Sequence, residues 1–365
     1  MNSMIPEAYE MKFENGIRHP FLFLWDAWSY EENNTLHLYS LAVARFTASR
    51  EEINPNNRND YPFHIRHFIS KDNGLSWKDE GCFLSPEEVS KLNYRTIWSG
   101  SVSPMPNGKK LVAYTGLENS DADHRFIQNI AIAISDDGYA INHSNKELSS
   151  AKKDWNSITE KGYYLDPVQI LGNNNGEQNG PIMTWRDPFV FYDKDNNLQL
   201  FWAAKIGPRT PAIARATLKH LDNSIVIEEL HPPVSVPDSD DFTQIEVPKI
   251  IFSKEQDCHY LIISSCNRLH EKQEDIEISK EIRVYKSKHL DGPWESLGDK
   301  ILGDQNLFGM TVLKTDFKNN RLLCIAPYTE KECKDRMLSF APVFYIYLDR
   351  LRVEFVYQHN EHFKL

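Results

Sequence analysis

The chain has 365 residues, a formal net charge of −11 and eight tryptophans. Its length fits two average domains or one large all-β domain, and its acidic balance argues against nucleic acid or an anionic membrane as the main partner. The N-terminal residues show no basic stretch followed by an apolar run, and no segment has the length of a membrane-spanning helix. We therefore expect a cytoplasmic protein, or one exported without a visible signal peptide.

Most apolar stretches are short, rich in β-branched and aromatic residues, and bounded by Asn, Asp, Gly or Pro, which is typical of strands. They group into five units, each with a first strand that carries polar residues, a more apolar second strand and an alternating third strand. In chain order the strands are 21–28, 35–44 and 62–70; 97–102, 109–116 and 128–135; 184–193, 197–204 and 212–218; 244–252, 258–265 and 281–288; and 306–313, 321–328 and 342–348. This pattern predicts an all-β protein, a five-bladed β-propeller, with residues 1–365 as a single domain.

Local signals mark the connections between these strands. Residues 85–92 (SPEEVSKL) predict a short helix, with a serine cap and proline just inside it. Residues 70–77 (SKDNGLSW) fit the hairpin turn known as an Asp-box, in which Asp accepts backbone N–H bonds and Trp plugs the sheet. The longest span without a clear pattern is 142–180, and its polar end at 173–180 (NNNGEQNG) predicts an exposed loop near the channel mouth.

The five cysteines form no CxxC pair and no cluster with histidine. They are Cys82, Cys258, Cys266, Cys324 and Cys333. Reduced thiols are the simplest interpretation, with no structural zinc, no other metal and no cofactor expected.

Three carboxylates stand on the first strands of three different units: Asp26, Asp187 and Glu246. Taken alone, each fits a salt bridge at a strand end. In a propeller, however, the first strands line one channel, so all three would point into a shared funnel. Like charges in a partly desolvated pocket raise at least one pKa and so provide a general acid near neutral pH. Two carboxylates flanking a glycosidic bond are the minimum machinery for glycoside hydrolysis.

The stretch 183–192 (MTWRDPFVFY) carries the most unusual of these carboxylates, because Arg186 and Asp187 stand side by side at the start of an apolar strand. A charge in such a place needs a partner. Pro188 cannot donate to a sheet ladder, which puts it at a strand start or edge. The pair therefore predicts a site held on a scaffold, with a purely structural Arg186–Asp187 pairing as the alternative.

Several segments in these strands resemble glycoside hydrolase family 68, the levansucrases and related β-fructofuranosyl enzymes. They are Trp25-Asp26-Ala27-Trp28, Trp98-Ser99-Gly100-Ser101, Arg186-Asp187-Pro188, Gln244-Ile245-Glu246 and Phe340-Ala341-Pro342-Val343-Phe344. They occur in family order, and the R-D-P motif is shared with families 32 and 43. The resemblance implies a five-bladed propeller that binds a small carbohydrate, sucrose or another fructoside.

The resemblance also implies catalytic roles. Asp26 is then the nucleophile that forms a fructosyl-enzyme ester, and Glu246 the general acid/base. Asp187 holds fructosyl hydroxyls and stabilises the transition state, and Arg186 neutralises the carboxylates while binding the sugar. The enzyme would be a retaining β-fructofuranosyl hydrolase or transferase.

Further residues are expected to contact the substrate. Trp25 and Trp98 would form the walls of the fructosyl subsite, with core packing as the alternative. Ser99 would hydrogen-bond the sugar or the nucleophile. Gln244 is expected on the leaving-group side, and either Arg268 or His270 would reach the sugar from the next strand.

The chain departs from the family pattern on the leaving-group side. Gln244 stands where the family usually has Glu, and Val247 where it usually has Arg. Thr243 replaces the Asp of calcium-binding members, so no calcium site is expected. Two alternatives stay open: a furanosidase acting on arabinose-type substrates, and a catalytically silent propeller that binds carbohydrate. The sequence does not define the oligomeric state.

Overall fold

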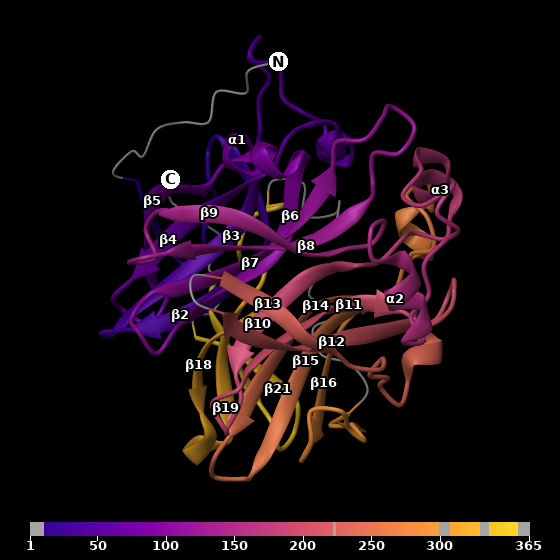
Figure 1. Ribbon diagram of the computed structural model, residues 1–365. Coiled ribbons are helices and arrows are strands. Elements are labelled where there is room, and N and C mark those ends of the chain that lie inside the picture. Colours follow the sequence, from indigo (N-terminus) through magenta and orange to yellow (C-terminus); the bar gives the residue numbers. More distant parts are fainter. Residues whose placement is uncertain (1–10, 222–223, 299–306, 329–335, 357–365) are drawn as a thin grey trace.

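Five antiparallel sheets make up the computed structural model, which describes residues 11–221, 224–298, 307–328 and 336–356 (Figure 1). Blade one contains β2 (Leu22–Glu32), β3 (Thr35–Ala44), β4 (His64–Ser70), β5 (Ser76–Leu84) and β1 (Lys12–Glu14). Blade two contains β6 (Tyr94–Pro104), β7 (Lys110–Glu118), β8 (Gln128–Ser135) and β9 (His143–Ser150). Blade three contains β10 (Arg186–Tyr192), β11 (Leu198–Lys205), β12 (Pro211–Leu221) and β13 (Ser224–Leu230). Blade four contains β14 (Gln244–Ser253), β15 (Cys258–Cys266), β16 (Lys280–Ser287) and β17 (Glu295–Ser296). Blade five contains β18 (Thr311–Asp316), β19 (Arg321–Ile325), β20 (Phe344–Tyr347) and β21 (Arg352–Phe355).

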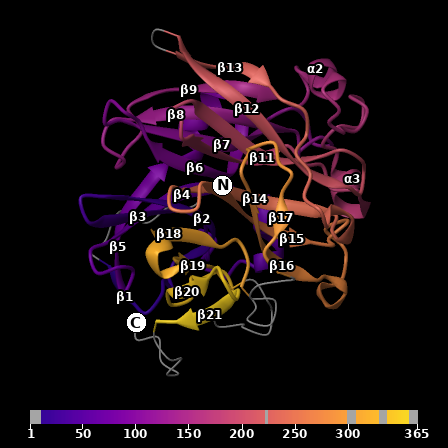
Figure 2. The same ribbon diagram turned by 90° about the horizontal axis from the view of Figure 1, so that it is seen from below.

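The innermost strands of neighbouring blades pack against one another around the centre. β2 packs against β6, β6 against β10, β10 against β14, and β18 against β2. Seen from below, β2, β6 and β14 gather in the middle while β1, β13 and β21 lie at the periphery (Figure 2). The prediction of a five-bladed β-propeller is confirmed. Each sheet adds a fourth strand to the three that the sequence pattern predicted.

The two ends of the described chain meet where the ring closes. Ile17 and Phe340 exchange two backbone hydrogen bonds of 3.1 and 2.9 Å, and the Leu24 N–H donates to the Leu338 carbonyl at 2.8 Å. These bonds join blade one to blade five. The segment around Phe340, which the sequence analysis singled out in the motif 340–344, therefore takes part in closing the ring.

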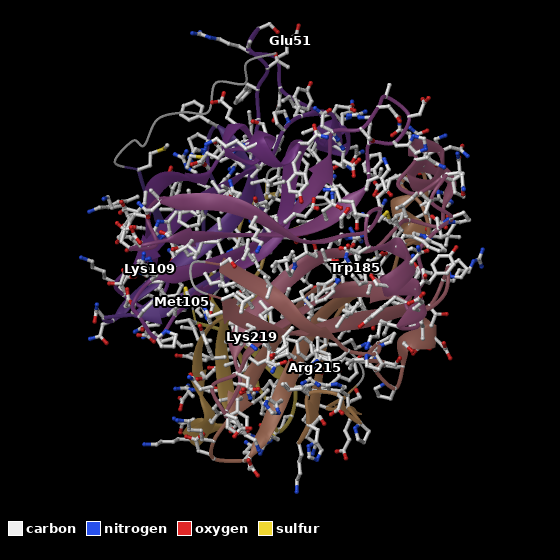
Figure 3. The ribbon with its side chains drawn as sticks, viewed as in Figure 1. Glu51, Met105, Lys109, Trp185, Arg215 and Lys219 are labelled. Carbon is white, nitrogen blue, oxygen red and sulfur yellow. The ribbon has the colours of Figure 1, made fainter. Side chains whose placement is uncertain are left out.

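Separate hydrophobic clusters fill the spaces between neighbouring blades, as expected for sheets that each bury both faces. The largest lies between blades two and three, around the fully buried Trp185 (Figure 3). The Trp185 ring meets those of Trp202 and Tyr163 edge-on, and its Nε1 donates to Ser149 Oγ at 3.1 Å. This packing fixes the residue directly before Arg186.

The predicted local elements are present with one correction. The helix near residue 85 is α1 (Pro86–Val89), with a complete capping box between Ser85 and Glu88, followed by the 3-10 turn η2 (Ser90–Leu92). In the Asp-box, Asp72 Oδ1 accepts from the Ser76 N–H at 2.9 Å, and Trp77 is buried. The span 142–180 is not irregular, because it holds β9, α2 (Trp155–Glu160) and α3 (Asn174–Asn179).

The remaining short elements are 3-10 turns: η1 (Pro55–Asp60), η3 (Ser239–Asp241), η4 (Asp275–Glu277) and η6 (Phe317–Asn319). Four of the five cysteines are free thiols, and the fifth, Cys333, lies outside the described residues. Among the helices of the described ranges, none is both long enough and apolar enough to cross a membrane.

Candidate active site

A β-bulge interrupts the inner strand of four blades at the residues that the sequence singled out. The register shifts around Asp26 in β2, around Ser99 in β6, between Arg186 and Phe189 in β10, and between Glu246 and Lys249 in β14. A bulge inserts an extra residue and re-aims a side chain that would otherwise follow the pleat. Because such a bulge recurs on the inner strands of neighbouring blades, the polar side chains turn towards one pocket.

The backbone at three of these bulges has a positive φ. Asp26 has φ +21°, Asp187 has φ +62° and Val247 has φ +44°, a region that a β-branched residue such as Val247 rarely adopts. The contacts of Asp187 explain the geometry. Its N–H donates to Thr115 Oγ1 at 2.8 Å, and its Oδ2 accepts from the Val247 N–H at 3.2 Å. The strained backbone therefore holds the carboxylate between blades two and four.

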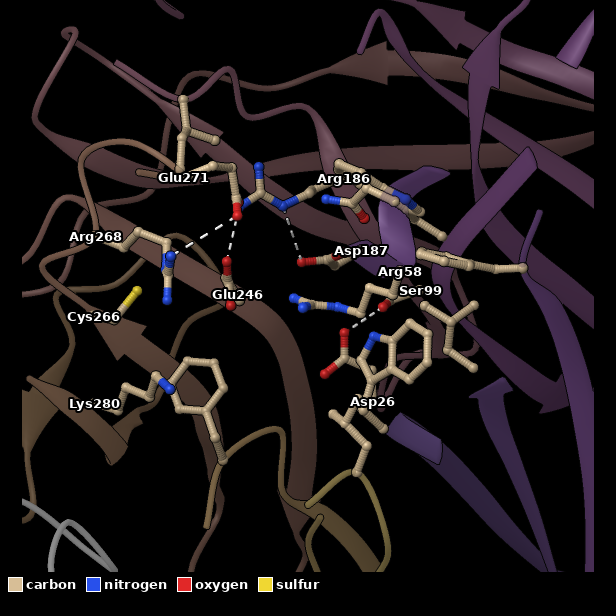
Figure 4. A pocket seen from close by; sticks show the side chains of 18 of the residues that line it. Asp26, Arg58, Ser99, Arg186, Asp187, Glu246, Cys266, Arg268, Glu271 and Lys280 are labelled. Carbon is tan, nitrogen blue, oxygen red and sulfur yellow. Dashed lines mark hydrogen bonds and ion pairs between the residues drawn. The ribbon is translucent and has the colours of Figure 1, made fainter. Parts of the chain in front are cut away.

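A pocket of about 180 Å³ opens above these residues. Every predicted site residue except Gln244 lines it: Trp25, Asp26, Trp98, Ser99, Arg186, Asp187, Glu246 and Arg268. Asp26 and Ser99 lie on one side, and Cys266, Arg268, Glu271 and Lys280 on the other (Figure 4). His270, the alternative to Arg268, is not part of the lining.

Among the described residues, Ser99 is the hydrogen-bond partner of the Asp26 carboxyl group. Ser99 Oγ donates to its Oδ2 at 2.5 Å, while its Oδ1 faces Gly309, where a Cβ atom would lie only 2.7 Å away. Burial raises the pKa of Asp26, and Glu246 raises it further. The Ser99 hydrogen bond and the positive charges of Lys249 and Arg58 act in the opposite direction.

Asp187 is 5% exposed, and burial raises its pKa to about 7. Arg186 opposes that rise, whereas Asp26 and Glu246 add to it. Because several carboxyl groups share one desolvated pocket, they compete for ionisation. The sequence predicted at least one raised carboxyl pKa in this pocket, and the structure has it at Asp187 and Asp26.

Arg186 connects the carboxylates. Its Nη2 donates to Glu246 Oε1 at 2.9 Å, and its Nε lies 3.7 Å from Asp187 Oδ2. The neighbouring carboxylates raise its pKa despite its burial. The guanidinium also lies over the Trp98 ring, 6.0 Å from its centroid. Arg186 thus lets several acidic groups occupy one small pocket.

Gln244 does not lie where we expected a substrate-binding residue. It is fully buried behind Arg186, and its Oε1 accepts from Thr184 Oγ1 at 2.8 Å and from Arg186 Nη2 at 3.2 Å. Its Nε2 donates to the Arg268 carbonyl at 3.3 Å. Gln244 therefore positions two arginines of the pocket and cannot reach a ligand directly.

The two tryptophans form a wall of the pocket. Trp25 meets Phe63 edge-on with 4.9 Å between ring centroids, and the Arg58 guanidinium lies 5.9 Å above its ring. Trp98 is tilted against Phe126 at 6.1 Å. Each ring packs against neighbours on one side and faces the pocket on another, so packing and ligand contact are compatible roles.

The sequence analysis missed several charged residues of the site. Arg58, Glu177, Glu271 and Lys280 line the pocket, from η1, α3 and the segments around β16. Lys249 is buried and is not part of the pocket lining. Its burial lowers its pKa to about 8, although the negative charges of Asp26 and Asp187 act to raise that pKa. Only Lys249 carried a signal in the sequence, as a lysine inside the apolar run 244–252.

Residues 52–273, more than half of the chain, match the model of the glycosyl hydrolases family 32 N-terminal domain. The chain belongs to this family. The family 32 match contains Asp187 and Glu246 and begins after Asp26, whose place in the pocket comes from the structure. Membership confirms the prediction of a glycoside hydrolase or fructosyltransferase class.

A curated relative is also similar to this chain. The chain is 20% identical, over 208 residues, to a β-fructofuranosidase, the insoluble isoenzyme CWINV3 of Arabidopsis thaliana. That alignment covers 49% of this chain and 34% of the relative, so the chain matches about a third of the length of that protein.

Levansucrases and an inulosucrase are among the similar solved structures. A Bacillus subtilis levansucrase variant superposes with a TM-score of 0.64 at 17% identity, covering 92% of this chain and 86% of that one. An inulosucrase from Halalkalicoccus jeotgali, bound to kestose, gives 0.63 at 16%, covering 97% and 92%. A B. megaterium levansucrase variant gives 0.65 at 16%, covering 98% and 90%. These similarities establish the fold.

Proposed function

We propose that this chain, taken as one catalytic propeller over residues 1–365, is a retaining β-fructofuranosyl hydrolase or transferase. Its substrate is sucrose or a related fructoside. The observation that carries the proposal is the convergence of Asp26, Asp187 and Glu246 on bulged inner strands in one pocket, with Arg186 between them. Family membership and the β-fructofuranosidase relative support the substrate class.

In the first step, Asp26 attacks the anomeric carbon of the fructosyl unit. The glycosidic C–O bond breaks, and Glu246 gives its proton to the leaving oxygen, which yields a fructosyl ester of Asp26 and a free alcohol. Oδ2 of Asp26 accepts from Ser99, which leaves Oδ1, beside Gly309, as the attacking atom. Burial raises the pKa of Asp26, and the Ser99 hydrogen bond and the Lys249 cation oppose that rise and so favour the ionised, attacking form.

In the second step, the Glu246 carboxylate takes a proton from water or from an acceptor hydroxyl, and the oxygen attacks the anomeric carbon. The ester bond breaks and Asp26 is released as a carboxylate. Water gives hydrolysis, and a sugar hydroxyl gives transfer. Asp187 holds fructosyl hydroxyls in both steps, and the Arg186 cation offsets the negative charge of the site.

The test is incubation with sucrose, raffinose and sucrose 6-phosphate, with free glucose and fructose measured separately. Fructosyl release from at least one donor is expected, and it should disappear in Asp26→Asn. An excess of glucose over fructose from sucrose would show transfer, and equal release would show hydrolysis. Release from none of the donors, or full activity of Asp26→Asn, would overturn the proposal. Binding without release would instead indicate a silent carbohydrate-binding propeller.

A further inference from the structure

Glu177 is a buried carboxyl group that faces the pocket. It lines the pocket from α3 and is 4% exposed, but its side chain makes no hydrogen bond or ion pair with any residue of the described ranges. An unpartnered polar group in such a place costs free energy. The mechanism above does not use it, so its position needs another explanation.

The backbone around Glu177 is firmly fixed. Its carbonyl accepts from the Glu271 N–H at 2.9 Å, across to the segment that follows β15. Asn173 caps α3, and Asn174 Nδ2 donates to the Ala122 carbonyl at 2.6 Å. The backbone that carries the carboxyl group is therefore tied to two other segments of the chain, and it does not sit on a free loop tip.

The charged neighbours of Glu177 place it on the Glu246 side of the pocket. Burial raises its pKa to about 8, Glu271 and Glu246 add to the rise, and Arg186 and Lys205 oppose it. Asp26 has a different set of charged neighbours: Glu246, Lys249 and Arg58. At neutral pH the carboxyl group is therefore mostly protonated and has an O–H to donate.

We propose that Glu177 is a specificity-determining residue whose neutral carboxyl group pairs with the sugar that Glu246 protonates. Its O–H donates to one hydroxyl oxygen of that sugar, and its carbonyl oxygen accepts from a neighbouring hydroxyl. These two hydrogen bonds recognise a leaving group with vicinal hydroxyls, as in a hexopyranose. A simple alkyl leaving group has no hydroxyl to form them and gains no binding energy from Glu177. The inference rests on the proposed function, because it takes the leaving group to lie beyond Glu246.

A comparison of two donors isolates this contact. Sucrose carries a hexopyranosyl leaving group, and methyl β-fructofuranoside carries only a methyl group. Glu177→Ala is expected to raise KM for sucrose by about 10- to 100-fold, since a hydrogen bond at a desolvated site is lost, and to change KM for the methyl fructoside by less than about threefold. Equal losses on both donors would overturn the inference.

The pH dependence tests the protonation state. As pH rises through about 8, the proton leaves Glu177 and KM for sucrose should rise in the wild type. Glu177→Gln retains a donor and an acceptor that do not titrate, so it should recover most of the affinity lost in Glu177→Ala and should lack this alkaline rise in KM. The inference fails if Glu177→Gln binds no better than Glu177→Ala, or if its KM keeps the wild-type pH dependence.

Two controls separate the possible failures. Glu274→Gln removes an exposed carboxylate outside the pocket lining, and it should match the wild type on both donors. Circular dichroism and Tm check the folding of each variant. If the wild type cleaves neither donor, the proposed function fails; sucrose titration followed by tryptophan fluorescence then still tests Glu177. Weaker binding in Glu177→Ala would support the contact, and unchanged binding would overturn it.

Discussion

Ser99 Oγ lies 2.5 Å from Asp26 Oδ2, and the two residues come from bulges in the inner strands of adjacent blades. The blade interface therefore sets the orientation of Asp26, the proposed nucleophile. Thr115 Oγ1 donates to the Ser99 carbonyl at 3.1 Å and accepts from the Asp187 N–H, so the same network extends to a second carboxylate. Hydrogen bonds between blades hold the site together. A substitution on one blade should therefore alter the placement of polar side chains on the next blade.

Ser99→Ala should move the acid limb of the kcat/KM profile to higher pH. The hydrogen bond from Ser99 lowers the pKa of Asp26, so its loss raises that pKa, and the ionised nucleophile appears only at higher pH. A bond to a charged group contributes about 1.5 to 3 kcal/mol, which corresponds to a shift of about 1 to 2 pH units. Ser29→Ala, whose hydroxyl donates to the Val312 carbonyl, is the matched control. An unmoved acid limb would contradict this role.

Gly309→Ala should abolish most activity because its Cβ would lie 2.7 Å from Asp26 Oδ1. Gly309 has φ +68°, so the substitution also strains the backbone, by about 1 to 2 kcal/mol. Gly108→Ala separates the two effects, since Gly108 has φ +86° and open space around its Cβ position. Both variants should lose similar stability in thermal unfolding, and only Gly309→Ala should lose at least about tenfold in kcat/KM. Equal activity of the two variants would show that Oδ1 is not the attacking atom.

Lys249→Met should shift the acid limb upward without a large loss of stability. The Lys249 cation favours the ionised forms of Asp26 and Asp187, and its removal raises the pKa of both. Burial already lowers the pKa of Lys249 to about 8, so an apolar replacement of similar length removes a costly charge. Lys254→Met, an exposed position just after the same strand, serves as the control. Identical pH profiles for the wild type and Lys249→Met would rule out this electrostatic role.

Gln244→Leu should lower both stability and activity through Arg186. The substitution keeps the volume but removes an acceptor from Thr184 and Arg186 and a donor to the Arg268 carbonyl. Buried groups left without partners cost about 1 to 3 kcal/mol in the free energy of unfolding. Denaturant titration and KM for sucrose measure the two effects. Normal KM with normal stability would mean that Gln244 does not position the arginines.

The fold could be predicted because its signals are local and repeated. Each blade begins with a polar-bearing strand and continues with apolar ones, and five repetitions leave few alternatives to a closed ring. Asp26, Asp187 and Glu246 could be predicted for the same reason, since equivalent strands of a propeller face one channel. The bulges that aim them could not be predicted, because Val247 has a positive φ that its side chain disfavours.

The rest of the pocket depends on contacts between segments that are distant in the chain. Glu177 stands in a run of Asn and Gly that reads as an exposed loop, and its burial follows from bonds to residues 122 and 271. Gln244 was predicted to bind substrate because the resemblance puts it where the family usually has a Glu on the leaving-group side. Alternation puts Gln244 and Glu246 on one face of a regular strand, but the described packing encloses Gln244 behind Arg186.

The proposed mechanism depends on a covalent intermediate at Asp26. Glu246→Gln should slow the second step, so mixing this variant with a donor that the wild type cleaves, followed by rapid acid quenching, should trap the ester. Peptide mass spectrometry is then expected to find one anhydrofructose unit on the peptide that contains Asp26, and none in the Asp26→Asn, Glu246→Gln double variant. Turnover by the wild type together with an adduct on another residue, or an unmodified Asp26 peptide throughout a measurable burst of released alcohol, would contradict the account.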